Sequence, residues 1–177
     1  MPDINGIPYV ESGDLVSAYP TVSQNLAQEV SDQLASKLDL AGGKILQIVR
    51  ATDTTNRNTT STSFVDANIS ATITPQKNDS AVLLIWSLLG AHITTADYAQ
   101  YAITDNSNNV ISGAEGNYLG SGSTTQVYAS QVFFAYATPA TTSATTYKGR
   151  YRNLASGTSY IYNSIQTGQF FAIEVSA

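Results

Sequence analysis

The sequence has no cysteine, one histidine and one tryptophan among its 177 residues. Without cysteine there is no disulfide scaffold, no thiolate nucleophile and no cysteine-based metal site. A Ser-His-Asp triad would have to use His92, and a zinc site would have that histidine and scattered carboxylates to draw on. His92 lies in the most hydrophobic stretch, which favours a structural role. The sequence also lacks a phosphate loop, a dinucleotide fingerprint and a nucleophile elbow, so we expect no metal and no cofactor.

Charge is scarce too, because only 12% of the residues are charged, about half the usual share. Serine and threonine are abundant, with 20 and 21 residues, which indicates a polar β surface that relies on hydroxyl groups. Eight basic residues against thirteen acids argue against nucleic acid as a partner. Lys148, Arg150 and Arg152 alternate along one predicted strand and would share its face. We interpret them as a solvated strand face or a subunit salt bridge in preference to a polyanion site.

Long hydrophobic runs are missing as well. The longest, residues 81–89, is too short to span a bilayer. The N-terminal residues MPDIN have neither the basic residue nor the apolar core of a signal peptide. We therefore expect no membrane insertion and no export by a cleaved leader.

What is present divides at the double glycine Gly42-Gly43. Residues 1–43 hold six acids and one base, for a net charge of −5, whereas residues 44–177 hold seven of each. Residues 1–20 have apolar side chains without a sustained period, which indicates an extended anchor peptide that packs on another protein. The candidate anchor residues are Ile4, Ile7, Tyr9, Val10, Leu15 and Val16.

Residues 21–41 have the pattern of a helix, beginning at a Thr21-x-x-Gln24 capping box. An apolar residue recurs every four positions, at Val22, Leu26, Val30, Leu34 and Leu38. An isolated helix of this length is marginal in water. We expect it to be an oligomeric neck, a short three-helix bundle; the alternative is a helix folded back on its own β domain.

Residues 44–177 alternate apolar and polar residues in the manner of β-strands. Strands are expected at 44–51, 62–74, 81–93, 98–104, 110–111, 126–138, 145–152, 159–164 and 169–176. The strand at 81–93 is expected to be central and buried on both faces. The Gly- and Ser-rich residues 112–125 are expected to form a loop that exposes Tyr118 and Leu119. The pattern predicts a mainly β protein with a jelly-roll-like antiparallel sandwich head.

Three tyrosines, Tyr98, Tyr101 and Tyr118, lie in or near expected loops, where an aromatic face can stack on a sugar. A place in the core or at a subunit interface is the alternative for each of them. Glycoside hydrolysis needs two carboxylates about 5–9.5 Å apart. The seven acids of residues 44–177 fall mostly in predicted turns or at strand ends. We therefore expect a protein that is not an enzyme.

Several segments resemble structural proteins of tailed bacteriophages. They are LAGGKILQIVRATDTT, TSFVDANISATITPQKNDSAVLLIWSL, TPATTSATTYKGRYRN and the ending GQFFAIEVSA. They look like the C-terminal domains of phage tail-fibre, minor-tail and head-fibre proteins, and the leader MPDINGIPYVESGDLVSAYP resembles short N-termini of actinobacteriophage virion proteins. The resemblance covers nearly the whole chain and carries no catalytic residue.

The resemblance implies a homotrimeric fibre or decoration protein, assembled in the host cytoplasm and displayed on the virion surface for attachment. Its N-terminal segment would bind a capsid or a tail protein, and the sequence leaves both open. The chain departs from long fibres in having almost no shaft. One alternative is a tail receptor-binding protein that recognises a host cell-wall glycan. A more distant alternative is a polysaccharide-degrading spike.

Overall fold

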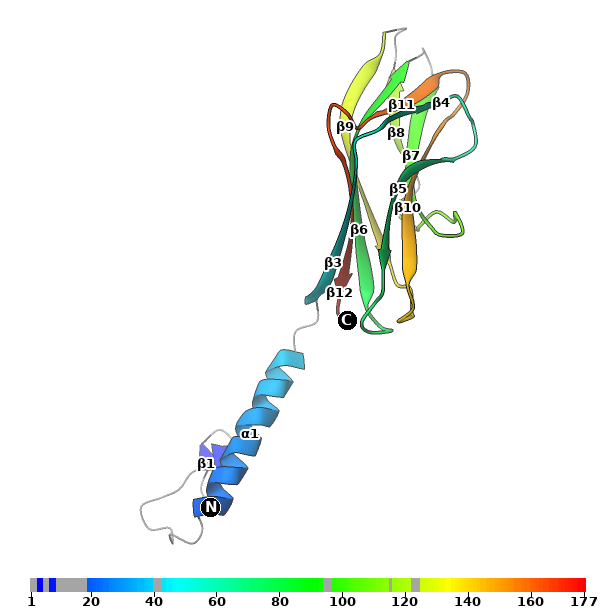
Figure 1. Ribbon diagram of the computed structural model, residues 1–177. Coiled ribbons are helices and arrows are strands. Elements are labelled where there is room, and N and C mark those ends of the chain that lie inside the picture. Colours follow the sequence, from blue (N-terminus) through cyan, green and yellow to red (C-terminus); the bar gives the residue numbers. More distant parts are fainter. Residues whose placement is uncertain are drawn as a thin grey trace. The chain divides into compact units, whose positions relative to one another are not determined.

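The computed structural model divides the chain into two compact units, Met1–Gly42 and Gly43–Ala177, at the double glycine of the sequence (Figure 1). The described residues are 3–4, 7–8, 19–39, 43–93, 97–114, 116–121 and 125–177. Each unit has its own architecture.

The N-terminal unit contains a small hairpin and one helix. Strand β1 (Asp3–Ile4) pairs antiparallel with β2 (Ile7–Pro8), and β2 contacts helix α1 (Tyr19–Asp39). The helix begins two residues earlier than the sequence predicts, so Thr21 lies inside the first turn and does not cap the helix. Pro20 is compatible with this start, because backbone N–H groups of a first turn have no partner within the helix.

The C-terminal unit, which we call the head, contains two antiparallel sheets. The larger is built from β3 (Ile45–Asp53), β4 (Asn56–Thr59), β6 (Ala81–Ile93), β9 (Val127–Ala137), β11 (Thr158–Tyr162) and β12 (Gly168–Val175). Strand β9 runs along one edge of β6, while β12 and β11 follow one another along its other edge. Strands β3 and β4 lie outside β12 and β11. This sheet is therefore four strand positions wide.

The smaller sheet has the order β5-β10-β7-β8, from β5 (Val65–Ile73), β10 (Thr145–Asn153), β7 (Asp97–Asp105) and β8 (Asn117–Ser121). Along the chain, consecutive strand positions cross from one sheet to the other, except that β7 and β8 are neighbours in the smaller one. Eight positions with this connectivity form a jelly roll. The expected mainly β sandwich, preceded by one short helix, is confirmed.

The core lies between the two sheets and is built by the period-two alternation of the strands. Trp86 of β6 is fully buried, with its ring 5.2 Å from Phe133 of β9 and 6.2 Å from Tyr101 of β7. Gly149 of β10 lies against the Trp86 ring, and a Cβ atom there would come within 2.8 Å of it. The residue facing Trp86 at this point therefore has to be glycine.

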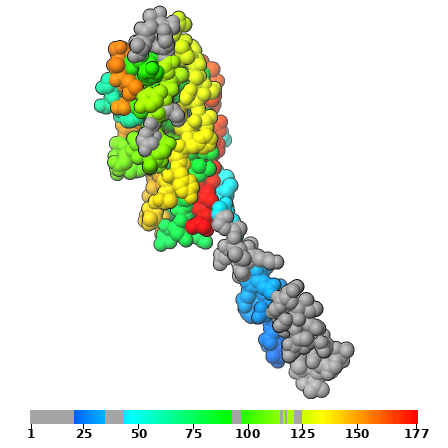
Figure 2. Space-filling model, turned by 180° about the vertical axis from the view of Figure 1, so that it is seen from behind, coloured from blue at the N-terminus to red at the C-terminus, as the bar shows by residue number. Residues whose placement is uncertain are grey.

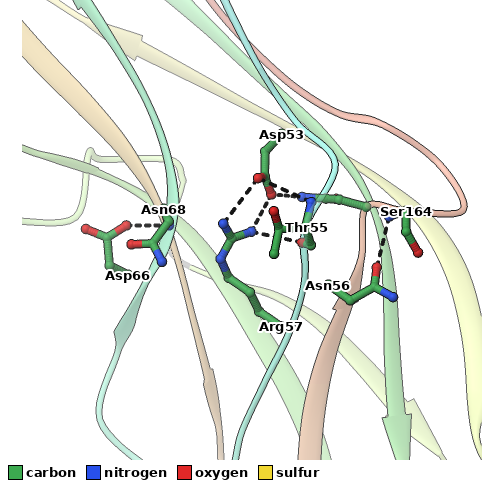
Figure 3. Close-up of polar contacts among 8 residues, drawn as sticks. Asp53, Thr55, Asn56, Arg57, Asp66, Asn68 and Ser164 are labelled. Carbon is green, nitrogen blue, oxygen red and sulfur yellow. Dashed lines mark hydrogen bonds and ion pairs between the residues drawn. The ribbon is translucent and has the colours of Figure 1, made fainter.

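Polar contacts hold the corner between β3 and β4 (Figure 3). The carboxylate of Asp53 pairs with the guanidinium of Arg57 and accepts hydrogen bonds from the Thr55 N–H at 3.3 Å and from Nδ2 of Asn163 at 2.6 Å. Burial favours a higher pKa, but the bonds from Arg57 and Asn163 outweigh it and hold the pKa of Asp53 below its usual range. These contacts hold the end of β3 in a fixed position relative to the start of β4 and to the residue that follows β11.

Three strand-level expectations need correction. The segment 112–125 is not wholly a loop, because Asn117–Ser121 forms β8, which pairs with β7 and buries Leu119. Residues 56–59 form β4, which the sequence pattern missed. Strand β6 is buried on one face only, since Leu83 and Ile85 on its other face are partly exposed.

A buried carboxylate ties the β5–β6 turn to the last strand. Glu174 of β12 is fully buried and accepts hydrogen bonds from Nε2 of Gln47 at 2.6 Å and from the backbone N–H of Gln76 at 2.7 Å and of Lys77 at 3.3 Å. Burial alone would raise the pKa of Glu174, but these hydrogen bonds outweigh it and hold that pKa below the ordinary 4.5.

Replacing Glu174 by Gln should lower the free energy of unfolding at neutral pH by about 2 kcal/mol, because hydrogen bonds to a buried charge are worth about 1.5–3 kcal/mol. Since the folded pKa is lowered, this stabilisation is present above pH 4.5 and is lost as the pH falls through the folded value. Denaturant unfolding at neutral and at acid pH measures the difference. Asp79→Asn, at an exposed acid of the same turn, is the control. A gap between wild type and Glu174→Gln that persists in acid would contradict the assignment.

Candidate interaction surfaces

Helix α1 carries an apolar stripe that is largely exposed within the N-terminal unit. Val22 is buried, whereas Leu26, Val30 and Leu34 are 37%, 50% and 59% exposed. Leu38, the last residue of the expected neck stripe, belongs to the helix, but its side chain lies outside the described part of the chain. The open stripe thus begins at Leu26.

The expected anchor residues cannot be placed in the same way. Ile4 lies in β1 and Ile7 in β2, but the side chains of both lie outside the described part of the chain. The other four candidates lie outside the described residues altogether: Tyr9, Val10, Leu15 and Val16.

The second apolar surface is the face of the larger sheet that points away from the core. Cross-strand register places Ile48, Ile173, Leu83 and Tyr136 in one row, and Arg50, Phe171, Ile85 and Phe134 in the next. We call this surface the outer apolar face and define it by Ile48, Leu83, Ile85, Tyr128, Val132, Phe134, Tyr136, Tyr160, Tyr162, Phe171 and Ile173. Residues 127–137 of β9, yellow in Figure 2, run along the surface of the head. Phe134 and Tyr136 are 59% and 60% exposed.

The outer apolar face is large and nearly uncharged. Strand spacings of about 4.8 Å and about 6.7 Å between side chains on one face give it an extent on the order of 400 Å². That is the size of the largest apolar patch on an ordinary monomer, and such patches are often functional. Arg50 is the charged residue in its rows, and its guanidinium lies 5.8 Å from the centre of the Phe171 ring. A partner for this face therefore has to be apolar and without a cluster of charge.

Strand β9 adds an unprotected edge to this face. It pairs with β6 along one side, and its sequence VYASQVFFAYA contains no charged residue and no proline. Natural edge strands usually carry lysine, proline or a bulge, which discourages pairing with other chains. An edge without these features is typical of a contact surface.

A third surface lies on the smaller sheet and includes two of the three tyrosines that the sequence singles out. Tyr98 of β7 and Tyr118 of β8 are 47% and 57% exposed, with ring centres 6.1 Å apart in an edge-to-face arrangement. Both lie on strands and not on loops. The expectation that Tyr101 faces a ligand is wrong, because Tyr101 points into the core and is fully buried, with its hydroxyl donating to the Tyr160 carbonyl at 2.8 Å.

His92 belongs to a buried polar network beside the turn that follows β10. Its Nε2 lies 2.9 Å from Oδ1 of Asn153, whose Nδ2 donates to Oδ2 of Asp97 at 2.8 Å. Asp97 also accepts from the backbone N–H groups of Ser156 and Gly157, both at 2.8 Å. Burial favours a higher pKa, but the bonds from Gly157 and other neighbours hold the pKa of Asp97 below its usual range. The network orders a turn.

The nearest hydroxyl does not turn this network into a nucleophilic triad. Ser159 Oγ donates to the Arg152 carbonyl at 3.0 Å and lies 3.3 Å from Oδ1 of Asn153, and it is fully buried. A nucleophile must instead reach the base and an exposed substrate. Among the described residues there is also no cluster of three metal-ligating side chains.

An open cleft of about 400 Å³ lies where the β7–β8 connection approaches the start of the β9–β10 connection, lined by Asp105, Ile111, Tyr136, Pro139 and Tyr147 among others. The carboxylate of Asp105 accepts two hydrogen bonds from Asn109, one from the backbone N–H and one from Nδ2. Both bonds lie within the turn that contains Asp105. Tyr136 belongs to the outer apolar face as well, so the cleft adjoins that surface.

Comparison of the chain with protein-family models found no matching family, and comparison with curated proteins found no matching sequence. In the part of the chain that the structure describes, no helix has both the length and the hydropathy needed to cross a membrane.

The sequence contains the apolar residues of the outer apolar face, but their pattern led us to expect the strand at 81–93 to be buried on both faces. Strands β6 and β12 carry apolar residues at both alternations, LLIW and FFAI, which a single sequence cannot distinguish from a strand covered on both sides by its own chain. The structure shows that the side chains of one of these alternations are partly exposed.

Replacing Tyr101 by Phe should lower the free energy of unfolding by about 1 kcal/mol, because the hydrogen bond from the Tyr101 hydroxyl to the Tyr160 carbonyl is lost. Tyr98→Phe, at a half-exposed ring, is the matched control and should change stability by less than about 0.5 kcal/mol. Denaturant titration followed by far-UV circular dichroism measures both. Equal effects of the two substitutions would contradict the distinction between the core and the surface tyrosine.

Proposed function

We propose that this chain is a structural protein of a tailed-bacteriophage virion, a short homotrimeric fibre or decoration appendage. Its N-terminal segment attaches to a capsid or tail protein, its helix forms an oligomeric neck, and its jelly-roll head is displayed on the particle for surface attachment. The mechanism is binding without turnover. The phage assignment and the number three rest on the resemblance of the sequence, and the self-association rests on the surfaces of the structure.

The observation that carries the proposal is the outer apolar face. Half-exposed rings such as Phe134 and Tyr136 are unfavourable in water, and burying them contributes roughly 25 cal/mol per Å² of apolar surface. Stable interfaces bury about 800 Å² on each partner. The face supplies a large share of that area, and the edge of β9 and the stripe of α1 supply more.

Copies of the same chain are the occupant that the chemistry favours. The helix and the head each leave an apolar surface open, and both belong to one chain. Association of identical chains covers both surfaces together, whereas unrelated partners would have to cover each one separately. The near absence of charge on the outer apolar face removes the like-charge repulsion that symmetric contacts otherwise incur.

The leader has a different chemistry and, in this proposal, a different role. Residues 1–43 carry the whole net charge of the chain, −5, and the head is neutral by count. Acidic side chains beside apolar ones suit a peptide that enters an apolar groove with a basic rim. Such a leader is compatible with assembly in the cytoplasm followed by display on the virion surface.

The self-association is tested by measuring the mass of the full-length chain by light scattering. A trimer is expected at micromolar concentration. Phe134→Lys should shift the mass towards the monomer, because an unpaired lysine buried in an apolar contact costs several kcal/mol. Thr72→Lys, at an exposed position of the smaller sheet, is the control and should leave the mass unchanged. A wild-type monomer, or a trimer that both lysines leave intact, would contradict this role of the face.

The anchoring role is tested separately by removing residues 1–20. The shortened chain should retain its head but fail to appear in purified particles, because the apolar residues proposed to enter the virion are lost. Quantifying the protein in particles assembled with either form measures this. Incorporation at the wild-type level would refute an N-terminal anchor and would leave the oligomer result standing.

A further inference from the structure

Five side chains form a continuous strip across the outward face of the smaller sheet. Phe64, just before β5, is followed by Arg152 of β10, Gln100 of β7 and Tyr118 of β8, with Tyr98 beside Tyr118. We call this strip the tyrosine platform. It has aromatic rings at both ends and a guanidinium and an amide between them.

Hydrogen bonds and stacking fix the platform in one arrangement. Nε of Arg152 donates to Oε1 of Gln100 at 2.6 Å, and Nε2 of Gln100 donates to the Tyr118 hydroxyl at 3.1 Å. The Arg152 guanidinium lies 4.7 Å from the centre of the Phe64 ring. Gln100 is itself 5% exposed, so the relay that orients Tyr118 runs beneath the surface. Such support is what preorganised binding sites require.

Two glycines make room for this arrangement. A Cβ atom at Gly120 would come within 2.5 Å of the Tyr98 ring, which therefore lies across the backbone of β8. A Cβ atom at Gly116 would come within 1.9 Å of Nε2 of Gln100, and Gly116 also has a positive φ of 88°. The rings of Tyr98 and Tyr118 are thus held in place although about half of each side chain is exposed to solvent.

We propose that the tyrosine platform binds an acidic saccharide. The apolar C–H face of a pyranose ring would lie on the Tyr98 and Tyr118 rings, which combine apolar faces with a polar tip. A carboxylate of the saccharide would accept hydrogen bonds from Arg152, whose hydrogen bonds to Gln100 and to the Thr62 carbonyl use two of the five N–H donors of a guanidinium. The Tyr118 hydroxyl, which accepts from Gln100, keeps its own proton to donate to a sugar oxygen.

The charges around the platform favour an acidic ligand over a neutral one. Lys148, Arg150 and Arg152 alternate along the outward face of β10. Asp66 is the cross-strand neighbour of Arg150, and the positive charge of Lys148 acts on the carboxylate of Asp105. Within the described residues, no carboxylate reaches ion-pair distance of any of the three, and Arg152 is the one whose side chain contacts Gln100 and the Phe64 ring of the platform. Arg152 is therefore the cation of this row that is best placed to bind an acid from outside.

This site goes beyond the proposed structural role and does not depend on it, because the platform lies on the smaller sheet and the proposed contact between copies lies on the larger one. A failure of either proposal therefore leaves the other intact. The competing explanation is that Arg152 and Phe64 only fix the chain before β5, in which case the platform has no ligand.

Calorimetric titration of the full chain with polygalacturonic acid, and with dextran of similar length, tests the proposal. The acidic polymer should bind, and dextran should bind at least tenfold more weakly. Tyr118→Ala should weaken binding of the acidic polymer at least tenfold, and Gly120→Ala should do the same by displacing the Tyr98 ring without removing it. Arg152→Gln should bring the acidic polymer down to the level of dextran. Ser70→Ala, on the same sheet face outside the platform, is the control and should bind as the wild type does.

Thermal unfolding and light scattering of the same samples separate loss of binding from loss of fold or of oligomer. The proposal is overturned if folded Tyr118→Ala and Gly120→Ala both bind as the wild type does, or if dextran binds as tightly as the acidic polymer. It is also overturned if neither polymer binds. Each of these results would leave the platform as a structural contact for the segment before β5.

Discussion

The head depends on the contact between Trp86 and Gly149. The indole of Trp86 fills the space between the sheets and packs on Tyr101 and Phe133, and the missing side chain at Gly149 lets the smaller sheet approach it. A protein interior is packed as densely as an organic crystal, so a methyl group added at Gly149 would have to move either the ring or the strand. This contact therefore limits how closely β6 and β10 can approach each other.

Once Trp86 is fixed as an inward residue, strand geometry determines which side chains point outward. Its neighbour Ile85 joins the outer apolar face, and on β10 the inward Tyr151 places Arg152 on the opposite surface of the head. The two outward faces are chemically unlike: one is apolar and nearly uncharged, and the other has paired tyrosines beside cations. A sandwich of this kind can use one face for its own copies and keep the other for a ligand.

The sequence predicted the division of the chain, the helix and most strands, because these depend on local periodicity and on glycine and proline. It did not predict β8, since Gly- and Ser-rich residues indicate a loop, and only the pairing with β7 recruits Asn117–Ser121 into the sheet. Tyr101 and Tyr98 lie three residues apart on one strand, which on geometry alone gives them opposite faces, but the spacing does not tell which of the two faces the core. Whether an apolar face meets the chain's own core or a partner depends on topology, which no local pattern contains.

The distribution of carboxylates explains why a head of zero net charge can still present cationic side chains. Glu174, Asp97 and Asp53 turn inward and accept backbone or side-chain hydrogen bonds, and the pKa of each lies below its ordinary value, so they remain ionised while serving the fold. Asp105 likewise binds within its own turn. Because these acids hold turns and corners, they are not positioned to neutralise Arg152, and the constraint that stabilises the loops leaves a positive group available at the surface.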